Sequence, residues 1–163
     1  MSVSKTTPVA WQRTHSHGRC IDGAIDAAAR ICESRGIRLT PLRRRVLELV
    51  WGNCKPVGAY GLLDELKREH SSAAPPTVYR ALEFLMEQGF VHRIQSLNAY
   101  VGCNDPGHSH KGIFLICNDC GDAVEIEDKG VANTIDRFAS GLGFLLASQS
   151  VEAAGLCPGC QEA

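Results

Sequence analysis

Two pairs of cysteines in the last third of this 163-residue chain have the spacing of a metal site. Each pair is a Cys-x-x-Cys motif, and the four residues are Cys117, Cys120, Cys157 and Cys160. Two such motifs can surround one tetrahedral Zn²⁺ with four thiolates, because the two-residue spacer turns both sulfurs of a pair inward. The closed ligand set predicts a structural zinc site, and a pair of dithiol redox centres is the alternative.

The cellular compartment bears on how these thiols are interpreted. The first 20 residues contain no apolar stretch that resembles a secretion signal, and no run of about 18 apolar residues occurs, so we expect a cytoplasmic protein without a membrane span. In a reducing cytosol, paired cysteines more often bind metal than form disulfides. Cys20, Cys32 and Cys54 match no motif, and we interpret them as structural.

A second, more dispersed set combines two imidazoles, one thiol and one carboxylate. Its members are His92, Cys103, His110 and Glu125. These ligand types also suit tetrahedral Zn²⁺, and the thiolate favours zinc over Mg²⁺ or Mn²⁺. Each residue alone has an ordinary structural explanation. A position around one domain junction would make them a shared site, and metal bound there could fix the orientation of two domains.

A third pattern indicates contact with nucleic acid. The segment 75–82 begins a predicted helix whose apolar positions leave Tyr79 and Arg80 toward solvent. Near the start of a helix-turn-helix recognition helix, Arg80 is placed to contact a guanine edge, and Thr77 and Tyr79 to contact phosphates. Weaker candidates for backbone contacts are Tyr60, Arg43 and Arg44. The alternative is a solvated helix face.

The elements that must position these residues follow from apolar periodicity and turn signals. In the N-terminal half we predict helices over 22–34, 41–52, 59–69 and 75–88, then strands over 90–94 and 100–101. Thr40 and Pro41 form a typical helix start, with a hydroxyl cap and a proline in the first helical position. Helices followed by a hairpin indicate a winged helix-turn-helix, with a small α+β domain unrelated to nucleic acid as the alternative.

The C-terminal half has a different pattern and charge. We predict strands over 113–116 and 123–126, a helix over 131–142 and a last strand over 144–154. Through Cys103 there are 14 Lys and Arg against 9 Asp and Glu, and beyond it there are 3 against 9. The expected fold class is α+β, with a flexible N-terminal tail (1–20), a winged-helix DNA-binding domain (21–102), a hinge (103–111) and a C-terminal α/β domain with structural zinc (112–163).

Several of these motifs together resemble the ferric uptake regulator family, and within it the zinc uptake regulator branch. The resemblance spans roughly residues 24–161. It is carried by the segments 38–43, 76–82 and 88–92, by His110 ahead of 113–117, and by both cysteine pairs in this order. The Thr-Val-Tyr-Arg helix together with both pairs is specific, whereas each motif alone is not.

The resemblance implies a homodimeric repressor, not an enzyme, that binds an operator in double-stranded DNA when loaded with zinc and represses zinc import genes. It implies that the C-terminal α/β domain (112–163) is the dimerisation domain. It also implies two zinc ions per protomer. The paired cysteines resemble the structural ligands, and the regulatory ligands are matched by His92, Cys103, His110 and Glu125.

Three alternatives remain at this stage. An iron- or peroxide-responsive regulator of the same family is one, although a thiol at Cys103 marks the zinc branch and the histidine run is reduced to His108 and His110. A deaminase-like zinc enzyme needs a proline before a Cys-x-x-Cys pair, which this chain lacks. A zinc module that binds only protein is the third. The role of His108 stays open.

Overall fold

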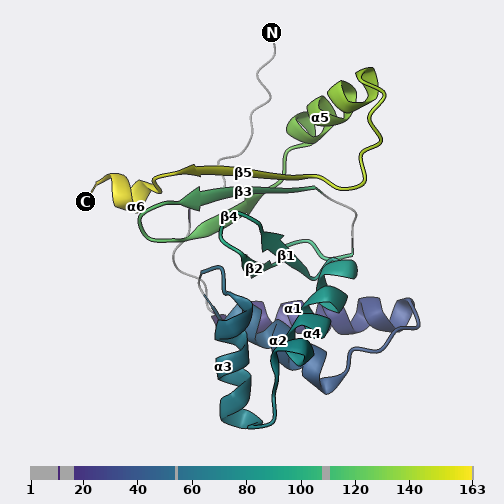
Figure 1. Ribbon diagram of the computed structural model, residues 1–163, viewed down its shortest axis with the longest axis vertical. Helices are drawn as coiled ribbons and strands as arrows, with labels where there is room; N and C mark the ends of the chain where they lie inside the picture. The colour runs from purple at the N-terminus through teal and green to yellow at the C-terminus, as the bar shows by residue number, and fades with distance from the viewer. Residues whose placement is uncertain (1–10, 12–16, 54, 108–110, 163) are drawn as a thin grey trace.

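The chain folds as the α+β protein that the sequence predicts (Figure 1). The computed structural model describes residues 11, 17–53, 55–107 and 111–162, so Cys54, His108 and His110 lie outside the described residues. The elements are α1 (His17–Ser34), α2 (Pro41–Gly52), α3 (Ala59–Glu69), α4 (Pro75–Glu87), β1 (Val91–Ile94), β2 (Ala99–Gly102), β3 (Gly112–Cys117), β4 (Ala123–Ile126), α5 (Lys129–Gly141), β5 (Ser150–Gly155) and α6 (Pro158–Gln161). No described helix is long and apolar enough to cross a membrane. Helix α1 begins at His17, inside the stretch expected to be a tail.

Helices α1 to α4 form the core of the N-terminal half. Thr40 caps α2 as predicted, because its side chain accepts a hydrogen bond from the Arg43 amide at 3.4 Å and Pro41 follows it. Helix α4 ends at Glu87, and Gly89 follows its C-cap with a φ of 76°, which lets the Phe90 amide donate to the Leu85 carbonyl at 2.8 Å. The apolar stripes of these helices meet in one buried cluster.

The hairpin β1–β2 follows α4 and completes the predicted winged helix. Its strands pair antiparallel, with His92 opposite Val101. Figure 1 shows the hairpin between the four helices and the second sheet. Ile94 of β1 is fully buried against Phe114 and Ile116 of β3, so the hairpin shares an apolar contact with the second sheet. The two halves of the chain therefore meet through the hairpin.

The second sheet has the strand order β4-β3-β5. Strand β3 pairs antiparallel with β4 and parallel with β5, and α5 makes the crossover that a parallel pair requires. The prediction of a strand from Phe144 is wrong at its start, because β5 begins only at Ser150. Gly143, with φ 67°, lies just after the C-cap of α5. The residues that follow it connect the helix to the start of β5, where Ser150 is opposite Gly112 of β3.

Candidate metal centres and DNA-binding face

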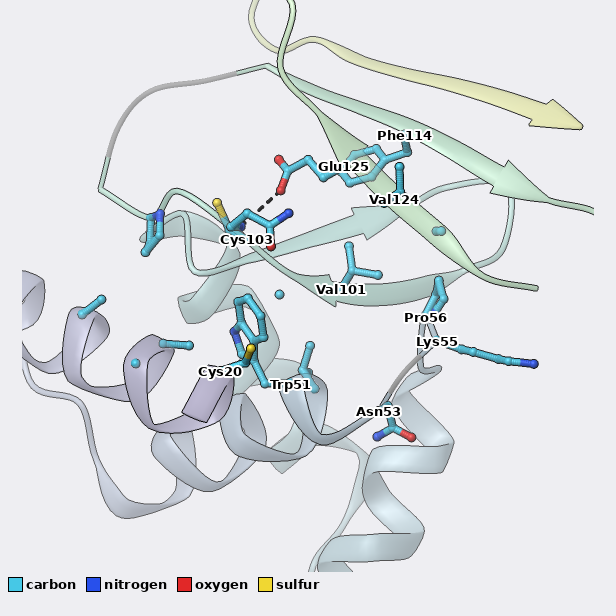
Figure 2. A pocket seen from close by; sticks show the side chains of 18 residues that line it. Cys20, Trp51, Asn53, Lys55, Pro56, Val101, Cys103, Phe114, Val124 and Glu125 are labelled. Carbon is cyan, nitrogen blue, oxygen red and sulfur yellow. Dashed lines mark hydrogen bonds between the residues drawn. The ribbon is translucent and has the colours of Figure 1, made fainter. Parts of the chain in front are cut away.

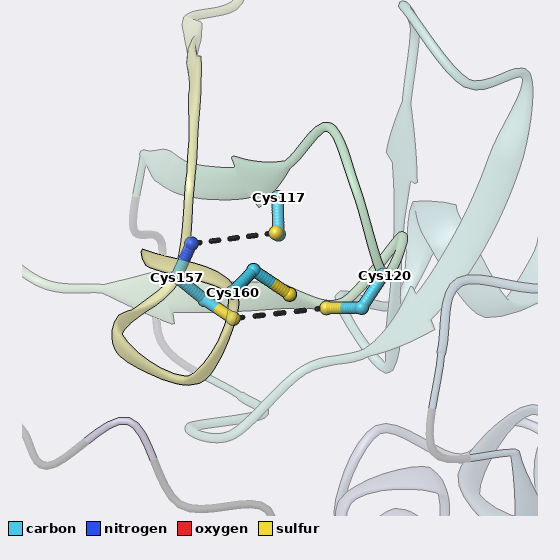
Figure 3. Close-up of side chains that lie close together, drawn as sticks. All are labelled: Cys117, Cys120, Cys157 and Cys160. Carbon is cyan, nitrogen blue, oxygen red and sulfur yellow. Dashed lines mark hydrogen bonds between the residues drawn. The ribbon is translucent and has the colours of Figure 1, made fainter. Parts of the chain in front are cut away.

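The four cysteines of the two motifs converge at one end of the second sheet (Figure 3). Cys117 ends β3, Cys120 lies in the turn toward β4, and the other pair flanks the start of α6. The four sulfurs lie within 4.8 Å of one another, and those of Cys120 and Cys157 are 3.8 Å apart. Zn–S bonds of about 2.3 Å place two sulfurs of a tetrahedral site about 3.8 Å apart. The cluster therefore fits one zinc ion.

The protonation of this cluster is uneven. The Cys157 amide donates to the Cys117 sulfur at 3.3 Å. Backbone hydrogen bonds from Cys157 and Cys120 lower the pKa of Cys117 to about 6. Hydrogen bonds to Asp119 and Cys157 instead raise the pKa of Cys160. The thiolate of Cys117 therefore forms more readily than that of Cys160, and a bound divalent cation would favour the thiolate form of both.

A second cluster lies where the hairpin meets the second sheet. It joins His92 of β1, Cys103 just after β2, and Glu125 of β4, whose ligand atoms lie within 4.8 Å of one another. The His92 Nε2 atom is 2.9 Å from Glu125 Oε1, and the Glu125 side chain is only 5% exposed. Figure 2 shows Glu125 extending toward Cys103. Three of the four predicted ligands are thus brought together, and the fourth, His110, lies outside the described residues.

The surroundings of this cluster fix its ligands. Burial and the nearby negative charge of Glu125 raise the pKa of Cys103 to about 12, so the thiol is neutral without metal. The Asn104 amide donates to Glu125 Oε2 at 3.2 Å (dashed in Figure 2). The ring of Phe114 meets the His92 ring edge-on, with 5.5 Å between centroids. Such outer contacts orient metal ligands, and the sequence did not indicate them, because one is a backbone amide and the other an apolar ring.

Helix α2 packs directly behind this cluster. A Cβ atom added to Gly102 would lie 2.3 Å from Trp51 Cε2, so the indole requires a glycine immediately before Cys103. A cavity of about 400 Å³ opens beside these residues, between α1, the end of α2, the hairpin and β4 (Figure 2). Both Cys103 and Glu125 line it. The ligands therefore sit at a junction where the N-terminal helices, the hairpin and the second sheet meet.

The outward face of α4 carries the residues predicted to contact DNA. Tyr79 is 40% exposed, Arg80 is exposed and Thr77 is half-buried, whereas Val78 and Leu82 face the core. On this helix the apolar periodicity therefore separated the buried from the exposed side chains correctly.

The weaker candidates for DNA contacts differ in their surroundings. Tyr60 on α3 is 67% exposed. The Arg44 Nε atom pairs with Glu48 at 3.2 Å. The Arg43 guanidinium lies 3.6 Å from the centre of the Phe84 ring and donates to the Arg38 carbonyl at 2.8 Å. Arg43 already has partners within its own chain, so a contact with DNA would compete with them.

Comparison with known proteins identifies relatives that match most of the chain. A model of the ferric uptake regulator family matches residues 34–154. The zinc uptake regulation protein of Escherichia coli (strain K12) is 44% identical over 138 residues, which cover 83% of this chain and 80% of that protein. A solved zinc uptake regulator complexed with zinc and DNA superposes with a TM-score of 0.83 at 39% identity, covering 91% of this chain and 97% of the other.

Two crystal structures of one further relative differ in how closely they superpose on this chain. The holo form of XcZur superposes with a TM-score of 0.81 at 48% identity, covering 87% of this chain and 99% of that one. The apo form gives 0.51 at 46% identity, with coverage of 86% and 97%. Because identity and coverage are nearly equal, the difference lies in conformation. The conformation of this chain is closer to the holo form.

Proposed function

Because the chain belongs to the ferric uptake regulator family, we propose that it is a zinc-responsive repressor of zinc-uptake genes. It binds an operator in double-stranded DNA as a homodimer, in the cytoplasm, and acts by binding rather than by catalysis. The observation that carries this proposal is the convergence of His92, Cys103 and Glu125 where the hairpin meets the second sheet. The names of the 44% identical relative and of the superposed DNA complex support it.

The first zinc ion of the proposal is structural. Its ligands are the four cysteines, whose sulfurs have tetrahedral spacing and offer no open position. The site ties the end of β3 to the segment after β5, and so it closes the second sheet at one end. We assign residues 112–163 to this dimerisation domain, which follows a DNA-binding domain (21–102) and a hinge (103–111).

The second zinc ion is regulatory. Its ligands are His92, Cys103 and Glu125, with His110 from the hinge as the fourth. Two of the three described ligands come from the hairpin or its end, and one comes from the second sheet, so a bound ion ties the halves together. The thiol at Cys103 supports zinc over Fe²⁺, because thiolates favour softer metals than carboxylate and imidazole alone.

Regulation follows from this position. With the regulatory ligands held together, the two winged helices of the dimer have a fixed orientation, which matches two half-sites of a palindrome. When the ligands separate, that orientation is lost. The closer fit of this chain to the holo than to the apo form of XcZur supports such a difference in conformation.

The operator contacts of the proposal lie on α4 and its neighbours. Arg80 reads a base edge, while Thr77 and Tyr79 bind phosphates, as the exposure of Arg80 and Tyr79 and the partial exposure of Thr77 allow. Tyr60, Arg43 and Arg44 add weaker contacts to the DNA backbone.

The dimer contact of the proposal lies on α5 and the segment after it. Phe138 is 64% exposed, Leu142 84% and Leu145 92%. Three large apolar side chains so exposed on one segment are unusual for a monomer and typical of an interaction surface. They support a second copy of this chain as the partner.

The proposal is tested by selecting DNA from a pool of random duplexes with the zinc-loaded protein. We expect a palindromic sequence to be enriched with Zn²⁺ and not with the metal-depleted protein. Fe²⁺ in place of Zn²⁺ should support binding poorly. Enrichment without metal, or with Fe²⁺ alone, would contradict the zinc-responsive function.

A further inference from the structure

One row of residues across the second sheet faces the hairpin. Phe114 of β3 is opposite Glu125 of β4 and also opposite Glu152 of β5. Cross-strand partners project from the same face of a sheet. The two carboxylates therefore flank Phe114 on the face that packs against β1, and each of them reaches a different part of the hairpin.

Glu152 holds the turn of the hairpin through its backbone. Its two carboxylate oxygens accept hydrogen bonds from two consecutive amides, that of Gln95 at 2.6 Å and that of Ser96 at 3.0 Å. Although burial alone would raise the pKa of Glu152, hydrogen bonds from Ser96 and Gln95 lower it overall. The ionised carboxylate is thus matched to the turn, and charge-assisted bonds of this kind are stronger than neutral ones.

The two carboxylates hold opposite ends of β1. Glu125 contacts His92 near the start of the strand, within the cluster of metal ligands. Glu152 contacts the amides just after the strand ends at Ile94, and among the described residues it belongs to neither group that could hold a metal. One attachment therefore consists of candidate ligands of the regulatory ion, and the other does not.

We propose that Glu152 is a positioning residue that anchors the hairpin turn to the dimerisation domain whether or not zinc is bound. It acts as the pivot of the switch, so that loss of zinc releases the His92 end of β1 while the turn stays attached. This inference rests on the proposed function for its effect on DNA binding. The anchoring itself is a property of the chain alone.

The test compares Glu152→Ala and Glu152→Gln with the wild-type full-length protein. Hydrogen exchange at the Gln95 and Ser96 amides should be slow in the fully zinc-loaded wild type and also after a mild chelator has removed only the regulatory ion. It should be at least about 10-fold faster in Glu152→Ala, because two bonds to a charged acceptor are lost. Glu152→Gln keeps the size of the side chain but has one acceptor oxygen instead of two. Its exchange rates should therefore lie between those of the wild type and of Glu152→Ala.

The same variants are then measured for zinc content and for affinity to the duplex selected by the wild type. Zinc content should be unchanged, and DNA affinity of the zinc-loaded Glu152→Ala protein should fall by about 10-fold. A residue that only stabilised the fold would lower the melting temperature without this loss in the folded protein. Glu162→Gln removes an exposed carboxylate of the same half and serves as the control.

Two results would overturn the anchor. One is unchanged exchange at both turn amides in Glu152→Ala and Glu152→Gln. The other is slow exchange in the wild type only when zinc is bound, which would make the attachment dependent on metal. If the wild type binds no DNA in response to zinc, the proposed function fails, and the amide exchange still decides whether Glu152 anchors the turn.

Discussion

The Nε2 atom of His92 lies 2.9 Å from Oε1 of Glu125, and this pair joins β1 of the hairpin to β4 of the second sheet. The Glu125 carboxylate is almost fully buried, and a buried charge is stable only with partners. Here the partners are the imidazole and the Asn104 amide. Two ligands from different halves of the chain are thereby held at a separation suited to one metal ion.

Cys103→Ser should separate regulation from structure. Loss of an outer-shell partner alone costs about 10- to 100-fold in metal affinity, so loss of this ligand should weaken the regulatory site by at least about 100-fold. Zinc-dependent DNA binding, measured by fluorescence anisotropy, should fall with it. The dimer and the four-cysteine zinc should persist. Loss of the dimer instead would assign Cys103 a structural role, and Cys20→Ser is the matched control outside both clusters.

Zinc affinity of the regulatory site should rise with pH. The pKa of Cys103 is raised from 9.0 to about 12, so zinc must displace its proton at neutral pH. One displaced proton makes affinity rise about tenfold per pH unit between about 7.5 and about 8.5. Competition titrations at these pH values measure the slope, and Cys103→Ser should show a shallower one. Equal slopes in both proteins would show that Cys103 is not a ligand.

The raised pKa of Cys103 makes the folding stability of the metal-free protein fall with pH, whereas zinc affinity rises. A folded pKa above the unfolded value favours the thiol, so Cys103 stabilises the apo fold below about pH 9. That contribution is lost as pH rises toward about 12. Chemical denaturation of the metal-depleted protein across this range should show the decline, and Cys103→Ser should lack this component.

Arg80→Ala should reduce sequence discrimination more than general DNA affinity. Loss of a bidentate contact to a guanine costs about 10- to 100-fold on the specific site. Binding to a scrambled duplex should change little. Lys129→Ala, which removes one positive charge from the start of α5, should leave both affinities nearly unchanged. An equal loss on specific and scrambled DNA would make Arg80 a phosphate contact.

Phe138→Glu should weaken the dimer. The side chain is 64% exposed in the single chain, and a carboxylate in its place would have to be desolvated at the interface. Analytical ultracentrifugation should show a shift toward monomer with zinc content at the four cysteines unchanged. Leu97→Glu makes the same change at a side chain that is 43% exposed on the hairpin turn, and it should stay dimeric.

The sequence predicted what depends on short-range patterns. The Thr40–Pro41 cap, the Gly89 stop and the two Cys-x-x-Cys motifs each carry their geometry within a few residues, and the helices and hairpin lie where periodicity indicated. The start of β5 was not predictable in this way. Phe144 and Leu145 look like strand residues, but the register with β3 excludes them.

Contacts between residues far apart in the sequence were harder to predict. His92, Cys103 and Glu125 had the right chemistry, but no spacing rule indicated that they meet, and their proximity depends on how the hairpin packs on β3. Glu152 carried no signal, because it binds backbone amides of Gln95 and Ser96 that any residue would offer.

The central claim, that an ion at the domain junction controls DNA binding, is tested most directly by metal analysis beside a DNA mobility shift. The wild-type protein should contain one zinc for each of the two ligand clusters. A mild chelator should remove the ion held by His92, Cys103 and Glu125 and abolish binding to the selected duplex, and added Zn²⁺ should restore it. Removal of that ion with DNA affinity unchanged would contradict the account.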